Sequence, residues 1–380
     1  MNENELKRKK RSYFVKGSFD IPFFIISIAL LTVGLIMLFS ASYAYSLQKT
    51  NSSFSIIKQQ LIVTIPSFII MLFISKLEYR YLKSFAWLIY GGVCGLLVLV
   101  LLLPANSKGF HRWIDLKVFT IQPSDFAKIA IIVLFAFLIS KYYERMKDFK
   151  FGVLTMGFLL AVVCGLVILE KHVSATIIIA AIGMTMMYVG GTRKEFFILA
   201  FVLGIGLLVI LYFVPHLDYA KVRIDAWLDK SYDPRGLRWQ INNSLNAIGS
   251  GGLFGAGLGN SKQKYLYVSE PQNDFIFAIV CEELGFVGAS IIICMFVFFI
   301  WRGIVIAIKA PDKFGSLLVI GIVAHVGLQT LLNIAVVSDS MPNTGIALPF
   351  FSSGGTAMLA LLIEIGIVLS VSRQSNLKKV

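Results

Sequence analysis

The acidic residue with the clearest chemical potential is Asp274, which stands where a polar stretch gives way to a long apolar one. Phe275, Ile276 and Phe277 follow it directly, so its carboxylate is expected at a boundary between water and lipid. A carboxylate that is partly removed from water holds a proton more readily than a free one, which suits a general base. The dipole of a helix also favours a carboxylate at its start, so the position alone is compatible with a purely structural role.

A second reactive pair is Asp125 and Lys128, which are three residues apart on one face of a predicted helix. Opposite charges at this spacing can pair and so reduce the cost of placing them near lipid. The preceding string, Gln122-Pro-Ser-Asp, is typical of a helix start. The pair therefore either holds the entry of the helix in place or offers a cation to a substrate.

These residues belong to a chain with the composition of a membrane protein. Of its 380 residues, 57% are hydrophobic and 15% are charged, whereas a soluble domain carries about 25% charged residues. This balance excludes a soluble enzyme, a disordered protein and a secreted disulfide scaffold. We predict an all-α, polytopic transmembrane helix bundle of ten spans. The spans are expected at roughly 21–40, 55–75, 84–103, 125–140, 151–169, 173–190, 195–214, 274–301, 315–337 and 346–371.

The basic residues predict the orientation of the bundle. Of the 35 Lys and Arg residues, 21 lie in the two tails and in alternate connections, a bias that marks the cytoplasmic face. Both termini are therefore expected in the cytoplasm. We predict basic tails at 1–20 and 372–380, a membrane domain at 21–371, and a long fourth extracytoplasmic loop at 215–273.

Other ligand classes have little support. No basic face remains once the apolar segments are marked, so nucleic acid is not an expected partner. The cysteines and histidines show no metal-ligand spacing. The sequence thus indicates no cofactor and no metal site, and it leaves a divalent cation open.

Three polar elements fall on the predicted outer side, at 104–128, 215–274 and 338–355. The second contains a possible amphipathic stretch, Tyr219–Leu228, and a glycine-rich run, Gly249–Gly259. This run fits neither common nucleotide-binding pattern, so flexible turns that fold the loop back onto the bundle are expected. The third is rich in proline and glycine, which predicts broken helix or re-entrant backbone that lines a cavity.

We expect these elements to converge on one extracytoplasmic cavity with an acid and an apolar wall open to lipid. Four cations could contribute to it: Arg112, Lys128, Lys262 and Lys264. Such a site would suit a substrate with a polar head, phosphate groups and a lipid tail.

Several strings in this sequence resemble the SEDS family of bacterial cell-wall glycosyltransferases, the group of FtsW, RodA and SpoVE. They are His111-Arg-Trp-Ile, Gln122-Pro-Ser-Asp-Phe-Ala-Lys, Ile248-Gly-Ser-Gly-Gly-Leu-Phe-Gly-Ala-Gly-Leu-Gly, Glu270-Pro-Gln-Asn-Asp-Phe-Ile-Phe-Ala, Glu282-Glu-Leu-Gly and Pro342-Asn-Thr-Gly-Ile-Ala-Leu-Pro-Phe-Phe-Ser-Ser-Gly-Gly-Thr. The resemblance covers essentially the whole chain. The chain departs from the family at Asp125, where Glu is usual, at Ser353, where Tyr is commoner, and at Gln272, where His is common.

The resemblance implies a lipid II polymerase of the bacterial cell membrane, with Asp274 as the catalytic base. By this likeness Asp274 would deprotonate the acceptor 4-hydroxyl, and undecaprenyl pyrophosphate would leave with inversion. The substrate-binding residues that we expect are Arg112, Trp113, Gln122, Ser124, Asp125, Lys128, Lys262, Lys264, Glu270, Ser352, Gly354 and Gly355. The implied partners are a class B penicillin-binding protein, which is a transpeptidase, and other membrane proteins of the divisome.

Three alternatives stay open. The Glu-Pro-Gln-Asn-Asp and Pro-Asn-Thr-Gly strings are more similar to FtsW or SpoVE than to RodA, which favours a division role at the septum over elongation or sporulation. A lipid II flippase would instead carry polar residues through the membrane midplane, whereas here they are expected at the outer edge. A scaffold that only recruits a transpeptidase predicts that Asp274 is dispensable.

Overall fold

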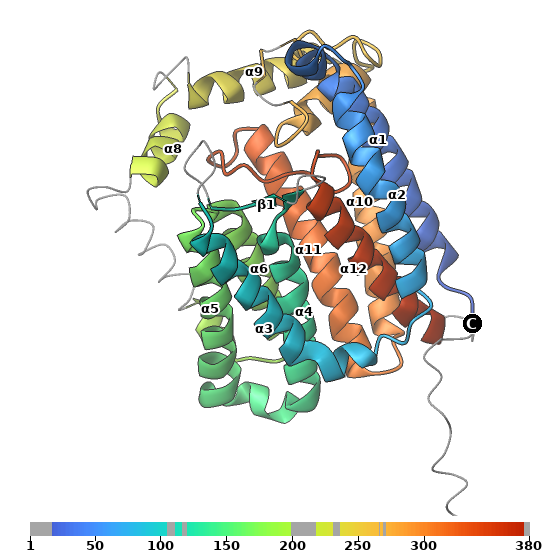
Figure 1. Cartoon of the computed structure of the whole chain (residues 1–380), viewed down its shortest axis with the longest axis vertical. Coiled ribbons are helices and arrows are strands. Elements are labelled where there is room, and N and C mark those ends of the chain that lie inside the picture. Colours follow the sequence, from blue (N-terminus) through green and yellow to red (C-terminus); the bar gives the residue numbers. More distant parts are fainter. Residues whose placement is uncertain are drawn as a thin grey trace, which may run out of the picture.

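The computed structural model describes residues 17–104, 111–115, 120–198, 218–230, 236–265, 267–268 and 271–375, and the regular structure in them is almost entirely helical (Figure 1). In chain order the elements are α1 (Ile21–Thr50), α2 (Ser55–Ile74), α3 (Tyr81–Leu102), β1 (Ile114–Asp115), β2 (Thr120–Ile121), α4 (Pro123–Lys141), η1 (Tyr143–Lys147), η2 (Phe149–Thr155), α5 (Met156–Leu169), α6 (Val173–Val189), α8 (Asp218–Leu228), α9 (Leu237–Ser250), α10 (Ile276–Ile308), α11 (Lys313–Val337) and α12 (Gly355–Gln374).

The helices confirm a polytopic membrane bundle. Among the described residues, eight helices are long and apolar enough to cross a membrane, and α6 is a shorter apolar helix of 17 residues. These nine correspond to nine of the predicted spans. The other predicted span, 195–214, lies almost entirely outside the described residues.

Three predicted boundaries are wrong. Helix α1 ends at Thr50 rather than at residue 40, and α10 ends at Ile308 rather than at residue 301. The last span was expected to begin at residue 346, but 346–354 is not helical and α12 begins at Gly355. Gly345 and Phe350 both have positive φ angles, of 72° and 69°, and Pro349 cannot donate a helical hydrogen bond. The expectation of broken backbone in 338–355 is therefore confirmed, and it extends to the start of this span.

Two aspartates tie helix ends together at the end of the bundle that carries the basic connections. Asp20 caps α1 by accepting a hydrogen bond from the N–H of Phe23 (2.9 Å), and it holds Arg302 of α10 with two bonds of 2.9 and 2.6 Å. Asp312 caps α11 in the same way and binds Arg80 at the start of α3 (2.8 Å). Each side chain thus satisfies an orphan helix N–H and fixes a neighbouring helix.

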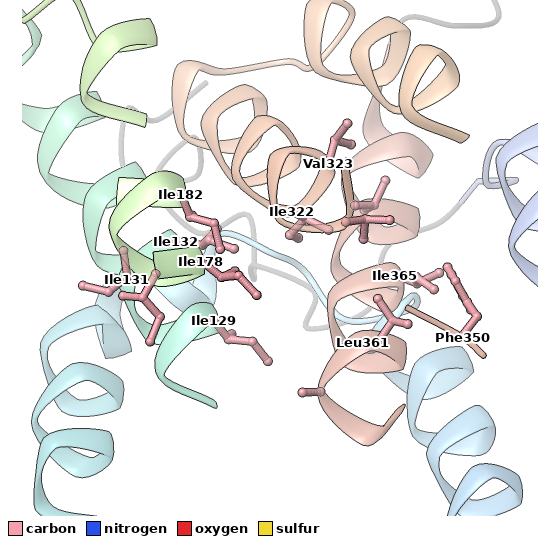
Figure 2. Close-up of a cluster of buried hydrophobic side chains, with 14 of the residues drawn as sticks. Ile129, Ile131, Ile132, Ile178, Ile182, Ile322, Val323, Phe350, Leu361 and Ile365 are labelled. Atoms are coloured by element: carbon pink, nitrogen blue, oxygen red, sulfur yellow. The ribbon is translucent and has the colours of Figure 1, made fainter. Parts of the chain in front are cut away.

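Helix α4 lies at the centre of the bundle and is buried along most of its length. It packs against α3, α6 and α11, while α12 packs against α2 and α10 packs against α1 and α11. Figure 2 shows the apolar side chains of α4 and α6 on one side and those of α11 and α12 on the other, with Phe350 beside Ile365. The core therefore lies between these helices. The long loop includes α8 and α9, which lie at one end of the bundle (Figure 1). Helix α8 coincides with the stretch at 219–228 that was predicted to be amphipathic.

Helix α10 is interrupted close to its start, at Gly285, whose φ and ψ are 67° and −170°. The glycine-rich run packs into this break. Four backbone hydrogen bonds join the two segments, each given from N–H to C=O: Ala256 to Glu282 (2.9 Å), Gly257 to Glu283 (3.0 Å), Phe286 to Gly252 (2.9 Å) and Val287 to Leu253 (3.1 Å). The run thus folds back onto the bundle as predicted, but it forms a bonded clasp around α10 rather than a loose turn.

Replacing Gly255 with alanine is expected to destabilise the protein by about 2 kcal/mol or more. A Cβ at this position would lie 2.2 Å from the carbonyl oxygen of Glu283, and the φ of 79° is unfavourable for any other residue. The measurement is the unfolding midpoint in detergent. Gly249→Ala is the matched control, because nothing lies within 4 Å of a Cβ there and alanine favours helix α9. Equal midpoints for the two variants would contradict the clasp.

Candidate active site

Asp274 lies in the turn 271–275, immediately before α10. From α11, the Nδ2 group of Asn333 donates to the carbonyl of Asp274 (2.7 Å) and to that of Ile346 (2.6 Å). From the other side, the hydroxyl of Ser352 donates to the carbonyl of Asn273 (2.8 Å). The backbone of the predicted base is therefore held by α11 and by the segment 338–354 together.

The carboxylate of Asp274 is packed against backbone. A Cβ at Gly345 would lie 3.1 Å from Oδ2 of Asp274 and 3.8 Å from Oγ of Ser174, and the φ of Gly345 is 72°. Only glycine allows this approach without strain. Ser174, at the start of α6, also donates to the carbonyl of Thr344. The N-terminus of α6 thus belongs to the site, which the sequence did not indicate.

The predicted pair of Asp125 and Lys128 is confirmed. Lys128 Nζ lies 3.0 Å from Oδ1 of Asp125, with 7% and 10% of the two side chains exposed. The hydroxyl of Thr356, in the first turn of α12, donates to Oδ2 of Asp125 (3.1 Å). A cation is therefore held near the entry of α4 in a fixed direction, with α12 as its support.

Gln122 and Ser124 contact His172, a residue that was not selected from the sequence. Nδ1 of His172 lies 3.2 Å from Nε2 of Gln122 and 3.1 Å from Oγ of Ser124. Burial, together with nearby Arg112, lowers the pKa of His172 to about 4. The ring is therefore neutral near pH 7, and because the amide nitrogen of Gln122 can only donate, Nδ1 accepts a hydrogen bond from it.

Arg112 lies beside Glu170, another residue missed in the sequence. Its Nε donates to the carbonyl of Glu170 (3.4 Å), and its guanidinium also donates to the carbonyl of Lys171. Glu170 is fully buried. Burial raises the pKa of its carboxyl to about 8, and Arg112 opposes the shift. The only available signal was an acidic residue in the short hinge between two apolar runs, which does not distinguish a site residue from an ordinary connection.

The raised pKa of Glu170 predicts a pH-dependent stability. The unfolded chain loses this proton above a pH of about 4.5, whereas the folded protein keeps it up to a pH of about 8. Between these values the folded state binds more protons, so its stability falls as the pH rises. Glu170→Gln removes this loss and should become more stable than the wild type by a few kcal/mol at pH 8. Unfolding midpoints from pH 4.5 to 9 measure the effect.

Exposed Glu144 provides the control for that series. Glu144→Gln should follow the pH curve of the wild type. A Glu170→Gln curve that also runs parallel to the wild type would show that Glu170 is ionised in the folded protein.

Lys262 and Lys264 are two residues apart but have different surroundings. The Lys262 side chain is exposed, and its backbone N–H donates to Glu282 (2.8 Å). The Lys264 ammonium lies 3.0 Å from Oε1 of Glu283, and these side chains are 2% and 0% exposed. Ser40 of α1 also donates to both carboxylate oxygens of Glu283 (2.7 Å). Lys264 therefore ties the loop to α1 and α10, and its contact with substrate stays a prediction.

The three predicted outer elements do meet. Arg238 of α9 pairs with Asp339 (2.8 Å), and Ser244 donates to the carbonyl of Val337 (2.8 Å). A small cavity of about 40 Å³ lies between the second half of segment 338–354, α4, α11 and α12, and its polar side chains are those of Lys128, His325, Gln329, Ser352 and Ser353. Neither Asp274 nor any other described residue of 215–274 lines it. This cavity is therefore not the predicted one that joins all three elements with the acid. Within the described residues, no three His, Cys, Asp or Glu side chains are placed to hold a metal ion.

The remaining residues that were predicted to bind substrate lie in different parts of the structure. Trp113 is 41% exposed next to β1. The N–H of Gly354 donates to Oε1 of Gln60 (3.2 Å), and Gly355 begins α12. Glu270 lies outside the described residues. Their roles as substrate ligands stay predictions.

Polar side chains were expected to cluster at the outer edge, but one pair of ionisable side chains lies deeper in the bundle. His325 and Glu364 lie near the middle of α11 and α12, and Nδ1 of His325 is 2.8 Å from Oε2 of Glu364. This contact could not be predicted, because the two residues are 39 positions apart in different apolar runs.

The chain is similar to known proteins over nearly its whole length. The profile of the cell cycle proteins FtsW, RodA and SpoVE matches residues 21–377. Stage V sporulation protein E of Bacillus subtilis is 37% identical over 365 residues, which are 95% of this chain and 99% of that protein. A probable peptidoglycan glycosyltransferase FtsW of Trichlorobacter lovleyi is 35% identical, over 95% of each chain.

Solved structures show the same fold at lower identity. A chain of a peptidoglycan synthase complex, described for its coordination of polymerization and crosslinking, matches with a TM-score of 0.77 and 22% identity. The match covers 93% of this chain and 98% of that one. The rod shape determining protein RodA of Thermus thermophilus matches with a TM-score of 0.69 and 23% identity, over 94% and 98% of the two chains.

Proposed function

The chain belongs to the FtsW/RodA/SpoVE family of cell cycle proteins, and from that premise we propose that it is a peptidoglycan glycosyltransferase that polymerises lipid II at the outer face of the cytoplasmic membrane. One observation carries the proposal. Asp274 lies in a turn that α11 and the segment 338–354 hold at their shared end of the bundle. A carboxylate in a turn whose backbone is held in this way, just before a membrane helix, presents a base where the polar head of a lipid-linked sugar would lie.

In this mechanism Asp274 is the general base. It accepts the proton of the 4-hydroxyl of the acceptor GlcNAc as that oxygen attacks the anomeric carbon of the donor MurNAc. The bond from this carbon to the pyrophosphate oxygen breaks, the bonding electrons leave with undecaprenyl pyrophosphate, and an α linkage becomes β. Attack on the face opposite the leaving group needs a base on that face, and one positioned base typically contributes about 10²–10⁴-fold to the rate.

Two cations are proposed to balance the charge that develops on the pyrophosphate. Lys128 is held by Asp125, and Arg112 is held by backbone carbonyls of the α5–α6 hinge. Fixed cations in a site with little water stabilise a developing anion more than mobile ones do. Both cations lie at fixed positions near the entry of α4 and the α5–α6 hinge. We propose them together as ligands of the leaving group.

The partner and cellular role are part of the same proposal. We propose a class B penicillin-binding protein as the transpeptidase partner, supported by the structural likeness to a chain of a synthase complex. The motif at 270–274 favours a division role at the septum. The SpoVE relative of Bacillus subtilis favours sporulation as the second candidate. Depletion in the native host distinguishes the two, because loss of a division enzyme gives filaments and loss of a sporulation enzyme leaves growth unchanged.

The decisive experiment uses purified full-length protein with its transpeptidase partner and lipid II. Glycan chains resolved by gel electrophoresis are the expected product. The rival function is a lipid II flippase, and the pair of His325 and Glu364 inside the bundle is the kind of group that a transporter uses. Transfer of labelled lipid II across proteoliposomes without any polymer would favour transport and overturn the proposal.

A further inference from the structure

Helix α11 presents a line of buried polar side chains at intervals of four residues. His325, Gln329 and Asn333 are 4%, 8% and 0% exposed, and this spacing puts them on one helix face. Each of the three forms a hydrogen bond to a group outside α11, and the first two also bond each other. The proposed reaction uses Asn333 to hold the backbone of Asp274 but gives no role to His325 or Gln329, and polar groups at this depth are costly unless they serve a purpose.

The hydrogen bonds of this line have a fixed direction. Nε2 of Gln329 donates to the carbonyl of Ala347 (2.8 Å), so its Oε1 faces Nε2 of His325, also at 2.8 Å. An amide oxygen only accepts, and therefore Nε2 of His325 carries the proton. This leaves Nδ1 of His325 to meet Oε2 of Glu364 (2.8 Å) with one proton between them.

That single proton makes the pair of His325 and Glu364 neutral overall. Removing it would leave a buried negative charge, and adding another would leave a buried positive charge, so both changes are unfavourable inside the bundle. Oε1 of Glu364 has no hydrogen-bond partner among the described residues. Whichever of the two atoms, Nδ1 of His325 or Oε2 of Glu364, carries the shared proton, the pair has no net charge.

The line ends on the segment that holds Asp274. Ala347, which Gln329 binds, follows Ile346, which Asn333 binds together with Asp274. The next residue, Leu348, donates from its N–H to Oγ of Ser352 (2.9 Å), the same hydroxyl that binds the carbonyl of Asn273. A shift of Ala347 would therefore move the backbone of both Asn273 and Asp274 through these hydrogen bonds.

We propose that Glu364, His325 and Gln329 form a charge-neutral strut that positions the segment 345–354, and through it Asp274, for the reaction. The strut runs from α12 across α11 to the carbonyl of Ala347. Its members are positioning residues and do not contact the substrate. The inference rests on the proposed glycosyltransferase function for its catalytic readout only, since the position of the turn can be measured without activity.

Two substitutions of Glu364 separate a neutral strut from a required charge. Glu364→Gln offers a donor to Nδ1 of His325 and keeps the strut neutral, so kcat should stay within about twofold of wild type. Glu364→Leu removes this partner and leaves Nδ1 unpaired. We expect kcat to fall about 10- to 100-fold while KM for lipid II is unchanged, because a displacement of about 1 Å at a reacting group has effects of this size.

The matched control is Thr330→Val, also on α11. Thr330 is 5% exposed, and within the described part of the chain its hydroxyl bonds only the carbonyl of Val326 in its own helix (2.8 Å). It should match Glu364→Leu in thermal stability and retain wild-type kcat. Loss of kcat in the control to the same extent would mean that any polar loss in α11 impairs activity, and the strut would be rejected.

A readout without catalysis uses Asp274→Cys in a background in which the four native cysteines are replaced by serine or alanine. The rate at which a charged methanethiosulfonate reagent labels this cysteine reports the position of the turn. Glu364→Leu should change the rate at least threefold, whereas Glu364→Gln and Thr330→Val should not. An unchanged rate with Glu364→Leu overturns the strut. Absence of polymer from wild type, combined with a changed rate, overturns the glycosyltransferase proposal and leaves the strut standing.

Discussion

Asp274→Asn is expected to reduce glycan polymerisation by about 10²–10⁴-fold, the usual contribution of a positioned general base. The amide has the same shape as the carboxylate but cannot accept the acceptor proton. The backbone contacts from Asn333 and Ser352 do not depend on the side chain, so the turn should keep its position. KM for lipid II should change little. The measurement is the initial rate of glycan formation by the complex with its transpeptidase partner.

Asp274→Glu is the informative companion. It keeps the carboxylate but extends it toward Gly345, where space is already limited. We expect a rate between those of Asp274→Asn and wild type. Wild-type rates from Asp274→Asn would exclude this base, and they would favour a scaffold or transport role for the chain.

Glu283→Gln is expected to give the largest loss of stability, about 3–5 kcal/mol, because it removes one partner of a fully buried ion pair. The Lys264 ammonium would remain 2% exposed beside a neutral amide. The carboxylate also accepts bonds from Ser40 and from the N–H of Ser261 (3.3 Å), so the loop, α1 and α10 would loosen together. The free energy of unfolding in detergent is the quantity to measure.

A double-mutant cycle tests whether the pair itself causes the effect. Lys264→Met combined with Glu283→Gln should cost several kcal/mol less than the sum of the single changes, because neither charge is then left alone. Glu78→Gln is the matched control. It breaks a pair with Arg80, whose side chain is 42% exposed, and should cost at most about 1 kcal/mol. Additive costs in the cycle would contradict a direct interaction between Lys264 and Glu283.

The parts of this fold that were predictable are those encoded over short distances. Nine apolar runs of about 20 residues correspond to nine observed helices, because a span must be apolar along its whole length. The pair of Asp125 and Lys128 was predictable for a similar reason, since both partners lie within one helical turn. Proline and glycine between 338 and 355 indicated broken backbone correctly.

The unpredicted parts depend on contacts between distant segments. Glu283 could be seen as a shallow acidic residue, but its partner Lys264 lies in a loop whose path the sequence does not reveal. His325 and Glu364 are single polar residues in otherwise apolar helices, and only helix packing brings them together. Glu170 and His172 were missed because the residues that they contact lie 48 to 58 positions away in the sequence.

The clasp between the glycine-rich run and α10 has a consequence for biogenesis. Inside a bilayer, the carbonyls of Glu282 and Glu283 and the N–H groups of Phe286 and Val287 would each cost several kcal/mol if left without partners. Their partners all lie between residues 252 and 257, which leave the ribosome before α10. The loop can thus be in place when α10 enters the membrane, so the polar backbone groups at the interruption need not face lipid without partners. Insertion of this helix and docking of the loop would then be a single event, ordered by the direction of synthesis.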